Sequence, residues 1–339
     1  MYEPQDIEIL RNLGYSEAKI MNVHRFHEGH IVKSFFDFIK EDMAEPRNPF
    51  RVEPFSVFLL RDEIANARAI RMNGRYMIVF HTKVIQMIDE AIQKRVPNAL
   101  APGDKLKWAL EEYFMQSIPY FMFQMVTLFI YYHELAHLNQ YKFKDLSNEL
   151  TNEAYDLVEG ERFNQIKHAM EIDADIFAAT QVAHRIFDFW SKIPEQRRDT
   201  SQLSSMVSLV SAGIFLFWYS MQGGWTSLYF LDHTHPHVLM RTFCIFDCMT
   251  SVMHGAGNIA NPLDREACQR DTFYIVSQLL KEPAGNGLID FWNLFVQNVD
   301  AMEDYFQKHM VPFSKGIPYL VQWNWLGTQK GPTRNETKK

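Results

Sequence analysis

Residues 117–137 read SIPYFMFQMVTLFIYYHELAH, and this stretch decides the fold. The part before His133 is almost entirely apolar, yet it is shorter than the roughly 20 residues that a membrane-spanning helix needs. Pro119 suits the first turn of a helix, where a backbone N–H has no partner within the helix. We therefore predict a helix that is buried on all sides and that carries His133–His137 into the protein core.

The end of this helix has a pattern suited to metal chemistry. His133 and His137 are four residues apart, so a helix places both imidazoles on one face, within reach of one cation. Glu134 is rotated from His133 by about 100°, which places its carboxylate beside that cation and not on it. Imidazole suits zinc, and a catalytic zinc lowers the pKa of its water to about 7, so that a nearby carboxylate can take the proton. The pattern predicts metal-assisted hydrolysis.

A second helix is predicted over Glu161–Trp190, where apolar residues recur at helical intervals. Glu171 and Asp175 share one face of it. A zinc site with two histidines needs a third protein ligand, and a glutamate from a second helix can supply it. Asp175 can then accept a hydrogen bond from the ring N–H of His133 or His137, which fixes the tautomer of that ring.

Two neighbours compete with Glu171 for the ligand position. His168 precedes Glu171 by three residues and could reach the same ion. Asp173 lies about 200° around the helix from Glu171, so the two carboxylates cannot comfortably face one cation. We therefore rank Glu171 ahead of both.

A third group of polar residues follows at His233–His237, which contains His235-Pro236, with Arg241 just beyond. Amide hydrolysis passes through an oxyanion, which a histidine or arginine outside the metal's ligand set can stabilise. An alternative interpretation is a polar turn at Pro236 with solvent-exposed histidines.

The order and internal spacings of these three elements resemble those of the gluzincin metallopeptidases, with a His-Pro and a later Arg completing the site. Two families share this plan: membrane-embedded peptidases of the HtpX and CAAX-processing type, and the Lit-like phage-exclusion peptidases, to which the chain looks closer. The resemblance spans about residues 60–245. It implies a Zn²⁺-dependent endopeptidase, with a possible role in phage exclusion or a stress response.

The resemblance also implies a role for each matching residue. The expected metal ligands are His133, His137 and Glu171, with Asp175 supporting them; the expected catalytic residues are Glu134 as general base and His235 and Arg241 as helpers of the transition state. His237 stays an alternative to His235.

An upstream segment adds a hairpin. Asn73-Gly74 is a strong hairpin turn signal, and the run Arg75–Phe80 that follows is short and rich in strand-forming residues. In the resembling families an Asn-Ala motif, here Asn66-Ala67, and such a hairpin supply an edge strand. An edge strand can pair with an extended peptide through main-chain hydrogen bonds. We expect Arg75–Phe80 to be that strand.

Composition narrows the class of protein and its partners. The chain has 339 residues, 47% of them hydrophobic, which is typical of a globular protein. A net charge of −7 argues against nucleic acid as the main partner. The three cysteines are Cys244, Cys248 and Cys268, a sparse and odd number that favours a reduced, cytoplasmic setting. Membrane association is not favoured, although Met206–Leu231 is also apolar.

We expect one predominantly helical α+β domain over residues 1–326, with a gluzincin-like core and a small edge hairpin packed on the helix that carries the site, followed by a disordered tail at 327–339. Three other functions stay open: a noncatalytic interaction protein whose metal only joins two helices, a membrane-associated peptidase, and an enzyme that hydrolyses a small amide instead of a peptide. The sequence does not indicate an oligomeric state.

Overall fold

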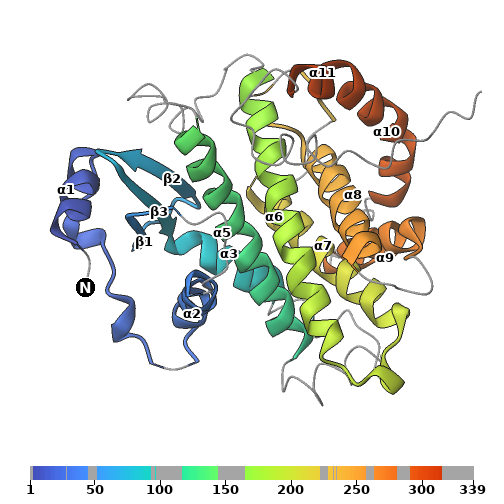
Figure 1. Ribbon diagram of the computed structural model, residues 1–339, viewed down its shortest axis with the longest axis horizontal. Coiled ribbons are helices and arrows are strands. Elements are labelled where there is room, and N and C mark those ends of the chain that lie inside the picture. Colours follow the sequence, from blue (N-terminus) through green and yellow to red (C-terminus); the bar gives the residue numbers. More distant parts are fainter. Residues whose placement is uncertain are drawn as a thin grey trace, which may run out of the picture.

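The structure of the protein is a computed structural model (Figure 1). The described residues are 3–27, 29–44, 52–92, 96, 117–143, 165–221, 228–231, 233, 235–256, 263–280 and 291–314. The predicted tail at 327–339 and the first residues of the predicted helix Glu161–Trp190 lie outside this part of the chain.

Helices dominate the described residues. They are α1 (Pro4–Asn12), α2 (Ile31–Met43), α3 (Thr82–Ile92), α5 (Ile118–Phe143), α6 (Gln165–Ser191), α7 (Thr200–Met221), α8 (Val238–Ala256), α9 (Arg265–Leu279), α10 (Phe291–Tyr305) and α11 (Val311–Ser314), with a π-helical turn at Phe306–Met310. Together with one small sheet, they confirm the prediction of a predominantly helical α+β protein.

The sheet has the order β1-β3-β2, in which β1 (Phe55–Leu60) runs parallel and β2 (Ala67–Met72) antiparallel to β3 (Arg75–His81). β2 and β3 form the predicted hairpin. Asn73 and Gly74 have φ values of 52° and 74° at its turn, the left-handed region that Asn-Gly tolerates. One detail of the prediction was wrong: the run from Arg75 is the central strand, because β1, which was not predicted, pairs with its other side. β1 and β2 are the two edge strands.

The long helix α5 lies between the two halves of the protein (Figure 1). It packs against the sheet, α2 and α3 on one side and against α6 and α7 on the other. Its apolar side chains are almost completely shielded from solvent, including Phe121, Val126 and Phe129 at 0% exposure. The prediction of a helix buried on all sides is therefore confirmed.

A buried polar cluster joins α2, α5 and α6 just before the histidines. Asp42 of α2 is 4% exposed, and it accepts hydrogen bonds from the Tyr132 hydroxyl of α5 and from the Arg185 guanidinium of α6. A buried carboxylate is tolerated only when it is paired and hydrogen-bonded in this way. The cluster therefore fixes α5 next to His133.

Helix α7 is long and apolar enough to cross a membrane, judged by length and composition alone. In its most apolar window 72% of the residues are buried inside the protein, as the core helix of a soluble protein would also be. It packs against α5, α8 and α9. It comes close to α5 at Gly213, where an added Cβ would lie 2.8 Å from Cγ2 of Val126.

This close approach predicts opposite effects for two glycine substitutions. Gly213→Ala should lower the free energy of unfolding by roughly 1–3 kcal/mol, because a stiff valine must move or be compressed. The matched control is Gly255→Ala in α8, where an added Cβ meets nothing within 4 Å. There the better helix former should raise stability by up to about 1 kcal/mol. Urea unfolding followed by circular dichroism measures both, and equal effects would contradict the close contact.

Candidate metal centre

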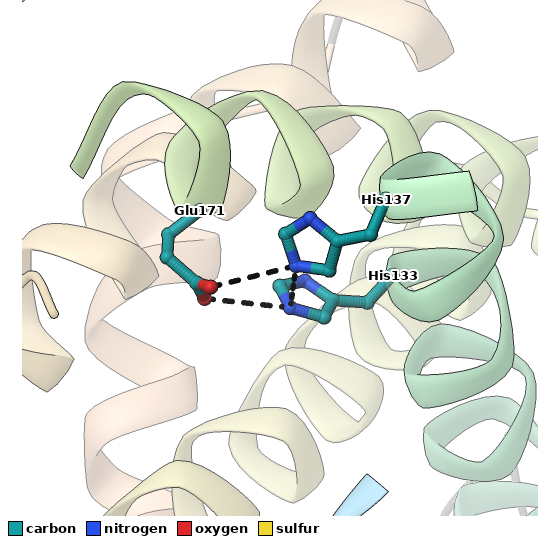
Figure 2. A group of neighbouring side chains, drawn as sticks. All are labelled: His133, His137 and Glu171. Atoms are coloured by element: carbon teal, nitrogen blue, oxygen red, sulfur yellow. Dashed lines mark hydrogen bonds and ion pairs between the residues drawn. The ribbon is translucent and has the colours of Figure 1, made fainter. Parts of the chain in front are cut away.

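The facing surfaces of α5 and α6 bring together the three side chains predicted to hold a metal. Figure 2 shows His133 and His137 from α5 and Glu171 from α6 converging on one point. The Nε2 atoms of the two histidines are 3.2 Å apart. Glu171 Oε2 lies 3.4 Å from His133 Nε2, and Oε1 lies 3.4 Å from His137 Nε2.

The three side chains are close enough to share one ion, because one donor atom from each lies within 4.8 Å of the other two. Ligand bonds of about 2.0–2.1 Å at tetrahedral angles put donor atoms about 3.3–3.4 Å apart. The two Nε2 atoms lie 3.2 Å apart, and each lies 3.4 Å from a different oxygen of Glu171, which is close to that spacing. Two imidazole nitrogens and a carboxylate are also a donor set that zinc accepts. The three residues therefore form a possible metal site.

The electrostatics of the site suit a cation. Burial raises the pKa of Glu171, but hydrogen bonds from the two histidines outweigh it and hold that pKa well below its usual value. Burial likewise lowers the pKa of His133, and hydrogen bonds to Asp175 and Glu171 overcome this and raise it to about 9. The Glu171 carboxylate thus stays ionised and attracts positive charge to this position.

Asp175 supports His133 from behind. Its Oδ1 lies 3.1 Å from His133 Nδ1, so that Nε2 is left to face the metal position. Arg241 of α8 holds Asp175 in turn: Nε donates to Oδ2 at 2.7 Å and Nη2 to Oδ1 at 2.8 Å. Arg241 Nη2 also lies 3.2 Å from Glu171 Oε2. Of the two histidines that the sequence left open, His133 is the one that Asp175 contacts.

His137 has a different support, which the sequence analysis missed. Its Nδ1 donates to Oε1 of Gln140 at 2.8 Å, and the Gln140 amide donates to Asp173 Oδ2 at 2.8 Å and to the Met170 carbonyl at 3.1 Å. Asp173 therefore holds Gln140, and Gln140 in turn orients His137. The available signal was spacing, because Gln140 follows His137 by three residues and shares its helix face.

His168, the other competing ligand, lies away from the three ligand atoms. Its Nε2 donates to the His233 carbonyl at 2.7 Å, so Nδ1 accepts from the Tyr305 hydroxyl at 2.8 Å. Burial lowers the pKa of His168 to about 4, which keeps the ring neutral and maintains this pattern. His168 thereby ties α6 to α10 and to the segment before α8.

His235 and His237 lie in the segment before α8 and have different surroundings. His235 Nε2 lies 3.9 Å from Glu171 Oε1, and 42% of its side chain is exposed. His237 is fully buried, and its Nδ1 accepts the backbone N–H of Leu239 in the first turn of α8. Only His235 of this pair thus reaches the metal position from the solvent side.

Glu134 lies beside the metal position, between α5 and the sheet. It is 7% exposed, and burial raises the pKa of its carboxyl group. The backbone of Ala69 in β2 also hydrogen-bonds to it. A carboxylate with a raised pKa that ligates nothing can take up and release a proton.

The metal site predicts the zinc content of purified protein. Wild type should carry about one zinc ion per chain, and Glu171→Ala should carry much less, because two imidazoles alone leave the site open on two sides. Asp188→Ala, at an exposed position of the same helix, is the matched control and should keep its zinc. Elemental analysis measures the zinc content of all three proteins. A zinc content of Glu171→Ala equal to that of wild type would rule out this ligand set.

No family model, no curated protein and no solved structure matches the chain.

Proposed function

We propose that this protein is a zinc-dependent endopeptidase. The observation that carries the proposal is the group of His133, His137 and Glu171, together with Glu134, a buried carboxylate that is not part of this candidate ligand group in the described chain. Zinc held by these ligands would supply Lewis-acid chemistry, which activates water and polarises a carbonyl near neutral pH. A site that only joined two helices would have no use for the extra carboxylate.

The protein's own residues can then divide the work of hydrolysis. Glu134 is positioned to take the proton of the attacking water and to return it to the leaving amine. His235 is partly exposed beside the metal position, so it can donate a hydrogen bond to the developing oxyanion. Arg241 is only 3% exposed and is bound to Asp175, so we assign it to support of the site. This changes the role expected for Arg241 and keeps the one expected for His235.

The edge strand favours a polypeptide substrate over a small amide. β2 pairs with β3 on one side, and its Ala69 backbone reaches Glu134. An extended peptide paired with the outer edge of β2 would pass next to the general base. We propose a substrate protein in the cytoplasm. A role in phage exclusion or a stress response stays a prediction, and membrane association stays an alternative that is not favoured.

The first test is Glu134→Gln, which keeps the size of the side chain but cannot accept a proton. We expect cleavage to fall by about 10²–10⁴-fold while the zinc content is unchanged. New protein N-termini can be compared by mass spectrometry in cells that express wild type or Glu134→Gln. Fragments present only with wild type identify substrates. If cells with wild type and cells with Glu134→Gln contain the same fragments, Glu134 is not the general base.

A second candidate function, a structural metal site in an interaction protein, would need a fourth protein ligand. His235 is the side chain placed to provide it, at 3.9 Å from Glu171. His235→Ala separates the two functions. For a peptidase the zinc affinity should stay within about threefold of wild type, because three protein ligands suffice for a catalytic site. A loss of zinc, measured by chelator competition, would instead favour the structural site.

A further inference from the structure

The charged side chain of Arg241 is almost completely shielded from solvent. It is 3% exposed, and the edge of its guanidinium is taken up by Asp175 and Glu171. A guanidinium bound through its edge has only its two flat faces left for packing. Trp218 of α7 covers one of them, with Arg241 Cζ 3.5 Å from the ring centroid. Such cation–π contacts are strongest where water is excluded.

The same indole also contacts a metal ligand. The rings of Trp218 and His133 are 5.5 Å apart between centroids, at an interplanar angle of 66°. Phe129, one turn earlier in α5, meets the indole edge to face at 6.3 Å. Trp218 thus touches both His133 and the arginine that holds Asp175 against His133.

The packing of α7 sets where this ring lies. Gly213 lets α7 approach α5 closely at Val126, and Trp218 follows five residues later, about 7.5 Å further along the helix. Trp218 therefore contacts Arg241 and His133 from the end of α7 that lies beside the metal centre. Helix α7 supplies none of the three ligands of the candidate site, so Trp218 is its contribution there.

Hydrogen bonding does not explain an indole at this position. Within the described chain its Nε1–H is buried and has no acceptor. Buried tryptophans usually pair that group, and an unpaired donor is unfavourable. A leucine would fill much of the space without this cost. We therefore attribute the tryptophan at this position to the packing of its ring face on the Arg241 guanidinium.

We infer that Trp218 is a positioning residue of the metal centre. Its ring holds the Arg241 guanidinium flat, Arg241 holds Asp175, and Asp175 fixes the imidazole of His133. Without the ring face Arg241 can tilt, and the contact between Asp175 and His133 loosens. Loss of such outer partners typically weakens metal binding by about 10- to 100-fold. The inference rests on the proposed zinc site.

The test is the zinc dissociation constant of the full-length protein, measured by competition with a chromophoric chelator at one pH. Trp218→Leu should weaken zinc binding about 10- to 100-fold, and Trp218→Phe, which keeps a ring face, should restore most of the affinity. The absorption bands of the cobalt-substituted protein should shift with Trp218→Leu and return with Trp218→Phe. Should Trp218→Leu not fold, Trp218→Met replaces it, since methionine adapts to irregular space.

A matched control separates site support from general packing. Trp190 also lies under an arginine, with Arg198 Cζ 5.1 Å from its ring centroid, but near the other end of α6 from Glu171. Trp190→Leu should lower stability and leave the zinc dissociation constant unchanged. In an Arg241→Lys background, which lacks the planar group, Trp218→Leu should add little further loss.

The outcomes also distinguish this inference from the proposed function. If wild type binds zinc and folded Trp218→Leu binds it equally well, Trp218 is ordinary core packing and the inference is wrong. An equal loss in Trp190→Leu, or a full additional loss in the Arg241→Lys background, would overturn it as well. If wild type itself takes up no zinc, the proposed function fails before Trp218 is in question.

Discussion

The burial of α5 is the constraint on which the other features depend. A helix that is apolar all round is unstable in water, so partners must cover every side of it. The sheet with α2 and α3 covers one side, and α6 and α7 cover another. Because His133 and His137 continue the same helix, they enter a region of low polarity together with it. Electrostatic interactions between groups there are stronger than at the surface.

Charges in such a place must balance locally. Glu171 and Asp175 bring negative charge to the centre, and Arg241 partly compensates it from α8. What remains favours a cation between the two imidazoles and the Glu171 carboxylate. Each histidine also has its own support: the carboxyl group of Asp175 for His133 and the amide of Gln140 for His137. A carboxylate beside an imidazole makes the ring more basic, so His133 should be the more electron-rich of the two histidines.

Sequence alone predicted what depends on periodicity and spacing. The apolar run before His133, the helical spacing of Glu171 and Asp175 and the Asn73-Gly74 turn are local signals, and each fixes a local structure. The roles of Gln140 and His168 depend on contacts with other elements, such as Asp173 across the helix pair and Tyr305 far along the chain. β1 was missed because its partner is β3, reached through a parallel pairing that leaves no turn signal between them.

The hydrogen bond between His168 and Tyr305 has a consequence for the order in which the protein is made. The ligands from α5 and α6 leave the ribosome well before α10, and domains begin to fold during synthesis. His168 is fully held only once Tyr305 has been added, and His168 in turn holds the His233 carbonyl near His235. A growing chain would therefore present the candidate ligands before the His233 carbonyl is held, which would delay full competence until α10 has been made.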